Sequence, residues 1–532
     1  MAKEADTKRS SGYGNSGASH TKRAFRDWFT EALSPDEDIT RNLPTLRARS
    51  RDLYMSTPLA AGAIKTITAG VVGSGLMIHP HIDRETLGLT DEQASEWEKK
   101  VEREWLAYSE STACDAQRSM NFYQMQRLAF MSSLMSGDCF IALPYIARPN
   151  SYYRLKGYLI EGDRVCNPTA QYLAEVLDPH KDIREGIEIG DFGEPVAYYV
   201  SKYHPGDHSG RRIYLNGDEF QKIMAFGQSG RQNILHIMDH ERPGQRRGVP
   251  LLSTVLENLK QIERYTSSEL MAAVISSYFT VFLKKVNPAE GFDGGIPSPT
   301  ATEEQEIDPN SIRLGQGAMV TLPQDTDIEI ANPGRPNSLY SAFIETQCRM
   351  MGSGIDLPYE MLVKHFIASY SASRAAQLEA NKAFRIRREM FIGQFIKPFF
   401  REWLLEAIIL GRINAPGALE DPMILDAYTH ITVTGDSVGC LDPTKEVQAA
   451  ILRIDNNLST IQQEAGELNG MSAEEIAQQR EKELNLFGFM TSKETSENSD
   501  KKIEDSGPSN NSNDKEEPDK GEKEDADTDP KE

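Results

Sequence analysis

The sequence predicts an α+β protein in which a strand-rich insert is followed by two long helical stretches with a loop-rich segment between them. Apolar side chains recur at helical spacing from Leu252 to Phe282, and again from about Ser373 to Leu410. Residues 140–240 are instead rich in β-branched and aromatic residues and are interrupted by glycine and proline, which is typical of short strands. Residues 287–311, rich in Gly, Pro and acids, predict a loop.

The N-terminal third predicts three helical blocks and one strand. The first 20 residues are Ser- and Gly-rich with no apolar core, so we expect a flexible arm and no secretory signal. Residues 45–70 have helical spacing around Pro58, and "VVGSGLMIHP" resembles a strand. Further helices are expected from Thr90, a natural N-cap, to Tyr108, and from Asn121 to Met135.

The middle of the chain predicts strands and then a long rod. "CFIALPYI", "YRLKGYLIEGDRV" and "QNILHIM" read as strands, with a hairpin turn at "GDFGEP". After Pro250 the helical rhythm continues to about Lys285, which gives a rod of roughly 50 Å at about 1.5 Å per residue. Few monomeric domains need such a rod. Helix is expected again from Ser338 to Met351, and Pro398 predicts a kink in the last long helix.

The charge of the chain limits its partners. With 58 basic and 80 acidic residues the net charge is −22, so any contact with nucleic acid phosphate must be local rather than driven by the global field. Residues 491–532 hold 15 acidic and 7 basic residues, a net −8, and read as disordered. The first 490 residues therefore still carry −14.

The sequence predicts no metal site, cofactor or membrane span. The five cysteines lie far apart without C-x-x-C spacing, which argues against a zinc site and a disulfide framework; they are Cys114, Cys139, Cys166, Cys348 and Cys440. The most apolar run, residues 271–283, is too short to cross a bilayer. We expect a reducing compartment and no membrane partner.

Three short motifs resemble parts of catalytic or ligand-binding sites but lack the other residues that such sites need. "DFG" at 191–193 occurs without a kinase catalytic loop and within a predicted hairpin, and "GVVGSG" at 70–75 has neither dinucleotide-binding spacing nor a Walker lysine. "HPH" at 79–81 with Asp83 lacks a second ligand cluster. No catalytic residue can be placed, and the sequence predicts a protein that is not an enzyme.

One short segment concentrates positive charge. "DHERPGQRRGVPLL", residues 239–252, places Arg242, Arg246 and Arg247 among turn-forming Gly and Pro residues, directly before the rod. An exposed loop of this kind presents guanidinium groups to a partner.

Several strings in a fixed order resemble the lambda-type phage portal proteins, also called head-to-tail connectors. The resemblance runs over about residues 41–490 and is sharpest in "ILHIMDHERPGQRRGVPLLSTVLENL"; it includes "LIEGDRV", "YEMLVKHFIASYSASRAAQLEANKAF" and "DPTKEVQAAILRIDNNLSTIQQEAGELNG". One departure is local: where the family usually has an acidic residue before its "YSS-x-R" string, this chain has Lys364 and His365 before "YSASR".

The resemblance implies a portal fold and a structural role. Such proteins form a ring, usually of twelve copies, at one capsid vertex, and double-stranded DNA enters and leaves through its channel. The implied partners are further copies of the chain, the terminase large subunit, major capsid and scaffolding proteins, and head-tail joining proteins. The protein would reside in the virion, and in the host cytoplasm during assembly. The alternative, a capsid-associated nucleic-acid enzyme or motor subunit, needs a phosphate loop or a metal site.

The resemblance also assigns the segments of the chain. In order they are a flexible arm (1–40), a wing that is helical and then β-rich (41–250), stem helix 1 (251–285), a clip (286–335), stem helix 2 (336–355), a tunnel loop (356–373), a kinked helix with wing return (374–440), crown helices (441–490) and the acidic tail (491–532).

Two sets of site residues follow from these assignments. Arg242, Arg246 and Arg247 are expected where the wing meets the stem, pairing with carboxylates of the adjacent subunit, with DNA phosphate as the second candidate. Lys364 and His365 are expected on the loop that projects into the channel, where a ring of lysines would touch passing phosphates weakly, and His365 would add charge in mild acid. The alternative is that Lys364 only solvates the tip of the loop.

Overall fold

The structure, a computed structural model, describes most of the chain and divides into two units, residues 1–439 and 440–532. The described residues are 13, 17–20, 22–168, 182–207, 220–277, 281–285, 326–330, 339–366, 370–436, 443–469, 473, 476–477 and 479–484. Each unit is treated by itself below.

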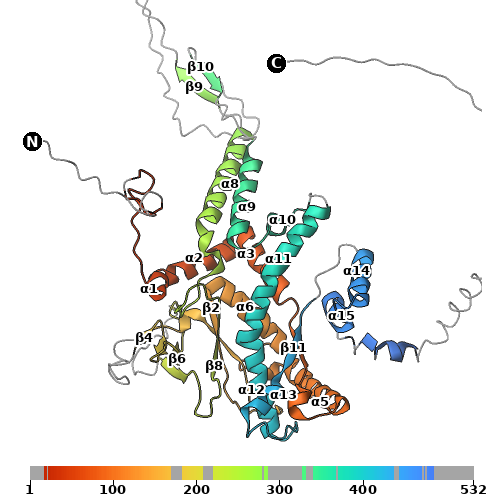
Figure 1. Cartoon of the computed structure of the whole chain (residues 1–532). Helices are drawn as coiled ribbons and strands as arrows, with labels where there is room; N and C mark the ends of the chain where they lie inside the picture. Colours follow the sequence, from red (N-terminus) through yellow and green to blue (C-terminus); the bar gives the residue numbers. More distant parts are fainter. Residues whose placement is uncertain are drawn as a thin grey trace, which may run out of the picture. The chain divides into compact units, whose positions relative to one another are not determined.

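The first unit contains the following described helices and strands (Figure 1). The α-helices are α1 (Pro35–Thr40), α2 (Leu43–Ser56), α3 (Pro58–Val71), α4 (Arg84–Leu87), α5 (Asp91–Ser109), α6 (Phe122–Ser136), α8 (Leu256–Ser277), α9 (Tyr340–Gly354), α10 (Tyr359–Val363), α11 (Tyr370–Phe391), α12 (Lys397–Ile409) and α13 (Pro422–Thr429). The strands are β1 (Met77–Pro80), β2 (Asp138–Ala142), β3 (Tyr158–Glu161), β4 (Ile183–Arg184), β5 (Ile187–Ile189), β6 (Pro195–Ser201), β7 (Phe220–Met224), β8 (Ile234–Met238), β9 (Val281–Lys285), β10 (Thr326–Ile330) and β11 (Ile431–Thr434).

Local sequence signals set the boundaries of the N-terminal helices as expected. Pro58 separates α2 from α3 by occupying the first position of α3, where its missing N–H costs nothing. Thr90 and Asn121 each form a capping box, with Gln93 and Gln124 respectively, and so fix the starts of α5 and α6. The predicted helices at 90–108 and 121–135 are confirmed.

Two small antiparallel sheets form the strand-rich region. Strand β2 lies at the centre of the order β3-β2-β8, and the other sheet has the order β4-β5-β6-β7. Every residue of β2 is buried, and successive side chains enter different cores: Cys139 and Ile141 join the main core, whereas Phe140 and Ala142 join the core shared with β6 and β7. The expected hairpin at 190–195 is confirmed between β5 and β6, with Gly193 at φ 84°.

Aromatic side chains fill the centre of the helical layer. Trp105 of α5 meets Phe122 of α6 and Trp403 of α12 edge to face, each with ring centroids 5.0 Å apart. Strand β1 pairs with β11 across more than 350 residues of sequence and closes this layer beside α5. The core therefore joins the N-terminal helices to the end of the unit.

Where a kink is expected at Pro398, the helix contains a π-helical segment just before the proline. Helix α11 passes through Ile392–Ile396 in π geometry before α12 begins at Lys397. Pro398 has no N–H to donate to the preceding turn, and a widened turn accommodates this loss without ending the helix. The long helix expected over 374–410 is confirmed, and it begins four residues earlier, at Tyr370.

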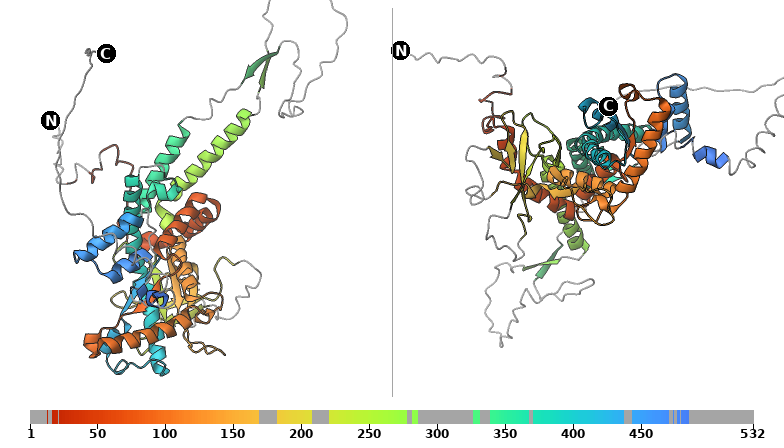
Figure 2. Two further views of the ribbon diagram at one scale, coloured as in Figure 1. Left: turned by 90° about the vertical axis from the view of Figure 1, so that its right-hand side faces the viewer. Right: turned by 90° about the horizontal axis from the view of Figure 1, so that it is seen from below.

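The rod after Pro250 is shorter than predicted. The described helix α8 ends at Ser277, and Val281–Lys285 form strand β9, paired antiparallel with β10. Val281 and Phe282 fit helical spacing, but they are β-branched and aromatic residues that a cross-strand partner stabilises as strand. Helices α8 and α9 lie side by side in Figure 1 and in the left-hand view of Figure 2, and they are joined by hydrogen bonds from Asn258 to Gln347 and from Tyr340 to Thr266.

Two expected loops contain helix. The segment expected as a flexible arm (1–40) ends in α1, capped by Ser34, and the expected loop at 356–373 contains α10 and the start of α11. Helix α10 is stabilised by Leu362, which is buried in the main core. Of the expected clip (286–335), only β10 lies within the described residues, and the acidic tail (491–532) lies outside them.

The second unit has two described helices, α14 (Pro443–Asp455) and α15 (Ile461–Asn469). Arg453 of α14 donates two hydrogen bonds to the carboxylate of Glu464 of α15, at 2.8 and 2.5 Å. This fork-shaped contact joins the two helices. Val447, Ile451 and Leu458 remain exposed on this unit.

Candidate functional site

The arginine-bearing segment is a tight turn between β8 and the start of the rod. Gly244 adopts φ 81°, and the side chain of Gln245 closes the turn: its Oε1 accepts hydrogen bonds from the N–H groups of Glu241 and Arg242, and its Nε2 donates to the carbonyl of Arg247. Gln245 is itself buried. The turn is therefore rigid, as its Gly and Pro content predicted.

Arg247 points into the protein, where it meets the buried carboxylate of Asp138. Its Nε donates to Asp138 Oδ2 at 2.6 Å, and its Nη2 donates to Asp138 Oδ1 at 3.3 Å. The remaining N–H groups donate to the carbonyls of Val165, Glu185 and Gly162. All five donors of the guanidinium are thus occupied within one chain.

Asp138 is shared with a second arginine. Arg47 of α2 donates from Nη2 to Asp138 Oδ1 at 2.7 Å and from Nε to the carbonyl of Ser136 at 2.7 Å. The side chains of Arg47, Arg247 and Asp138 are 5%, 2% and 0% exposed. We call these three residues the buried charge cluster. It joins α2, the first residue of β2 and the arginine turn.

The backbone is shaped to bring these groups together. Gly137 caps the C-terminal end of helix α6 with φ 90°, and the backbone of Gly248 lies against it. A side chain on either glycine would overlap the backbone of the other. This close approach places Arg247 against Asp138.

The electrostatics of the cluster follow from burial and charge. Burial by itself would raise the pKa of the Asp138 carboxyl, but the guanidinium groups of Arg247 and Arg47 outweigh burial and hold this pKa well below its usual range. Burial lowers the pKa of His236, whose ring stacks on Phe140 with centroids 4.1 Å apart. Asp138 is therefore a permanent anion at neutral pH.

Arg242 and Arg246 bind the acidic helix α1. Arg242 pairs with Asp38 at 2.5 Å and donates to the carbonyl of Leu33 at 3.1 Å, and Arg246 pairs with Asp36 at 2.5 Å. Each of the three predicted arginines thus pairs with a carboxylate of its own chain. For Arg247 the expected contact with an adjacent subunit or with DNA is wrong, because its guanidinium is buried and fully bonded within the chain. For Arg242 and Arg246 such a contact stays a prediction.

Lys364 and His365 lie together where α10 ends. Lys364 adopts a left-handed conformation with φ 55°, and the N–H of His365 donates to the carbonyl of Glu360 at 3.0 Å. This geometry ends the helix and turns the chain. Both side chains are exposed, as a contact with a passing ligand requires; their position in a channel stays a prediction.

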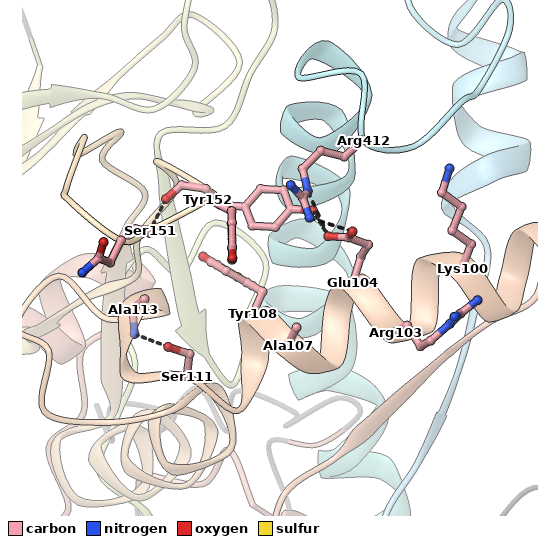
Figure 3. A pocket seen from close by; sticks show the side chains of 12 residues that line it. Lys100, Arg103, Glu104, Ala107, Tyr108, Ser111, Ala113, Ser151, Tyr152 and Arg412 are labelled. Carbon is pink, nitrogen blue, oxygen red and sulfur yellow. Dashed lines mark hydrogen bonds and ion pairs between the residues drawn. The ribbon is translucent and has the colours of Figure 1, made fainter.

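One concavity of the described residues, with a volume of about 490 Å³, lies beside α5 (Figure 3). In it Arg412 lies over the Tyr152 ring, with its guanidinium carbon 4.8 Å from the ring centroid, and donates two hydrogen bonds to Glu104 at 3.0 and 2.7 Å. The Glu104 carboxylate is therefore already bound by a cation of the same chain.

The catalytic look-alikes have structural roles in the described residues. Asp191, Phe192 and Gly193 form the tip of the β5–β6 hairpin, and His79 contacts Glu102 at 2.9 Å and Thr434 at 3.0 Å. Burial raises the pKa of the Cys114 and Cys139 thiols to about 12, so neither is a nucleophile at neutral pH.

One cluster of metal-ligand type occurs in the described part of the chain. Glu161, Asp163 and His204 have ligand atoms within 4.8 Å of one another. The guanidinium of Arg51 forms ion pairs with Glu161 and Asp163. A cation is thus already supplied by the protein, and the cluster is an ion-pair network.

Sequence reasoning missed the residue at the centre of the site. Asp138 is a lone acid that begins an apolar strand in "GDCFIALPY", and an acid in such a place implies a buried cationic partner. The three consecutive acids of "PDED", Asp36, Glu37 and Asp38, are a second signal, because their charge is opposite to that of the arginine turn.

Comparison with known proteins identifies the family. The profile described as "Phage portal protein, lambda family" matches residues 21–388. The chain belongs to the lambda family of phage portal proteins. This membership agrees with the family that the sequence strings resembled.

Curated relatives are similar over most of their length. The chain is 23% identical to Portal protein B of Escherichia phage lambda and 22% identical to the portal protein of Escherichia phage N15, each over 473 residues. The alignments cover 86% of this chain, and 86% and 87% of the two relatives. A probable portal protein of Halomonas phage phiHAP-1 is 21% identical over 434 residues, with 80% of this chain and 78% of the relative covered.

Among solved structures, chains from the neck and virion of a native gene transfer agent (GTA) particle are similar at 13% identity. Each has a TM-score of 0.39 and covers 80% of this chain and 92% of the other. Similarity at this level does not define the assembly. Among the described residues, no helix is both long and apolar enough to cross a membrane.

Proposed function

We propose that twelve copies of this chain form a closed ring at one vertex of a phage capsid. The ring nucleates head assembly, and double-stranded DNA enters and leaves through its channel. Membership of the lambda portal family over residues 21–388 carries the proposal. On this proposal the protein belongs to the virion, and to the host cytoplasm during assembly.

The paired helices α8 and α9 support self-association. Leu270 and Met271 of α8 are 66% and 59% exposed in the single chain, and Met350 of α9 is 58% exposed. Apolar side chains repeated along one helix pair favour burial against a further copy. We therefore assign α8 and α9 to the stem, where each pair packs against its neighbours.

The remaining segments take the roles that the resemblance implies. The clip (286–335) docks the terminase large subunit and later the head-tail joining proteins, and α14 with α15 belongs to the crown. Major capsid and scaffolding proteins are further partners of the ring. In the ring, Lys364 and His365 repeat around the channel and attract phosphate weakly. Each contact is screened and easily released.

The arginine turn connects the wing to the stem in this proposal. Arg247 fixes the turn from inside the protein, whereas Arg242 and Arg246 lie nearer the surface, with side chains 46% and 21% exposed. These two arginines could also meet a carboxylate of the adjacent subunit. DNA phosphate is the less favoured partner, because a fixed cationic clamp would oppose sliding.

The test is the mass of the purified, full-length protein. We expect a particle that is a multiple of the 59.5 kDa chain, and Leu270→Glu should abolish it by placing a carboxylate in the subunit contact. Ser268→Glu is the matched control, because Ser268 is exposed and lies about 200° around the same helix from Leu270 at about 100° per residue. A ring that tolerates Leu270→Glu as well as Ser268→Glu would refute the assigned stem contact.

A further inference from the structure

The segment before α1 forms a turn that displays aromatic side chains. The N–H groups of Phe25 and Arg26 both donate to the carbonyl of Lys22 at 3.0 Å, and the N–H of Trp28 donates to the carbonyl of Phe25 at 3.3 Å. The rings of Phe25 and Trp28 stack with centroids 6.0 Å apart. Trp28 is 67% exposed and Phe29 is 89% exposed. We call residues 22–30 the aromatic arm.

The arm leaves the body at a fixed point. Helix α1 is held through Asp36 and Asp38 by Arg246 and Arg242, and Arg184 adds a contact with Asp36 at 3.2 Å. The carbonyl of Leu33 is also bound by Arg242. Anchoring reduces the conformational entropy that the arm loses on binding a partner, so the arginine turn prepares this segment for docking.

The composition of the arm is that of a protein interface. Trp, Phe and Arg are enriched at the energetic centres of such contacts, and the arm combines Trp28 and Phe29 with Arg23 and Arg26. Because Trp28 and Phe29 are largely exposed in the single chain, their burial against a partner would be favourable. In Figure 1 the segment before α1 extends away from the helices and sheets of its own unit.

Charge points to a second copy as the partner. The first 30 residues hold six basic and three acidic residues, a net +3, in a chain whose net charge is −22. The rest of each copy therefore carries −25, so the arm is attracted to the body of another copy.

We propose that the aromatic arm of one subunit binds the adjacent subunit and so links neighbours around the ring. The proposal rests on the ring of the proposed function, and the arm acts in addition to the stem. From the anchored Leu33 back to Phe25 the chain can span about 26–29 Å at about 3.3–3.6 Å per residue.

Photocrosslinking tests the contact directly. With benzoylphenylalanine in place of Phe29 in the full-length chain, irradiation of the purified ring should give a denatured species of about twice the 59.5 kDa chain mass. Irradiation of the unassembled chain should not give it. Crosslinks that stay within one chain, that join the arm only to DNA, or that appear only when capsid protein is present would each overturn the proposal.

A substitution pair separates the arm from general surface effects. Trp28→Ser with Phe29→Ser should still give rings, but should raise the rate at which labelled subunits exchange at least tenfold. Phe192→Ser is the matched control, because Phe192 is 99% exposed and lies at the β5–β6 hairpin rather than in the arm; its exchange rate should match the wild-type ring. Equal rates in the arm variant and the control would refute the arm contact alone, whereas a wild-type chain that never assembles would refute the ring as well.

Discussion

The buried charge cluster gives the sharpest test of the structure itself. Asn in place of Asp138 keeps the shape of the side chain but removes its charge. The carboxylate accepts from Arg247 at 2.6 Å and from Arg47 at 2.7 Å, so the substitution leaves two buried guanidinium groups uncompensated. Breaking a buried ion pair by removing one partner costs about 3–5 kcal/mol. We expect a loss in the free energy of unfolding at the upper end of that range, because two cations are affected.

Urea unfolding of the unassembled chain, followed by tryptophan fluorescence, measures this loss. Trp105 and Trp403 are buried in the main core and report its unfolding. Glu379→Gln is the matched control, since Glu379 pairs with Lys382 at 3.2 Å with both side chains 74% exposed, and we expect it to cost less than about 0.5 kcal/mol. A loss for Asp138→Asn within about 1 kcal/mol of the control would refute the importance of the cluster.

The pH dependence of this loss has a defined sign. The pKa of Asp138 is lower in the folded protein than in the unfolded chain, where the usual value is about 3.9. Its contribution is therefore complete above that value and is lost as pH falls through the lower, folded-state pKa. The difference between wild type and Asp138→Asn should be constant from about pH 5 to 8 and should shrink below about pH 4. A difference that grows in acid would contradict this assignment.

Three further predictions concern the proposed ring. Lys364→Glu should leave the ring intact but change the packaging rate or DNA retention in a salt-dependent way, since screened phosphate contacts are lost; no change at any salt concentration would show that Lys364 only solvates its loop. Truncation after Met490 should leave the mass of the ring unchanged apart from the deleted residues, because the tail has few apolar side chains to bury, and loss of assembly would contradict this. Deletion of residues 289–306 should preserve the ring and weaken terminase binding, measured by co-sedimentation; a ring that falls apart while terminase still binds would reverse the clip assignment.

The sequence predicted helices better than it predicted their ends. Helical spacing with recognisable N-caps located α5 and α6, and Pro398 marked the break before α12. Periodicity failed at Val281–Lys285, because Val and Phe fit both a helical repeat and a strand. The outcome there depends on pairing with β10, which lies more than 40 residues away.

The candidate site shows the same limit. The Gly and Pro residues of 239–252 predicted a turn that carries the arginines. The guanidinium groups in turn predicted that their partners are carboxylates. Which carboxylates these are could not be predicted, because they are far away in the sequence. Asp138 is 109 residues from Arg247, and Asp36 is 210 residues from Arg246. One arginine of the turn is buried and two bind α1. The close packing of Gly137 against Gly248, which positions the buried arginine, could not be predicted from the sequence.

The mass of the assembled particle tests the central claim most directly. Native mass spectrometry of the purified full-length chain should give a closed species near twelve times 59.5 kDa, and negative-stain images of the same sample should show rings with a central channel. A chain that remains at 59.5 kDa across the micromolar range and shows no ring would contradict the proposed portal assembly.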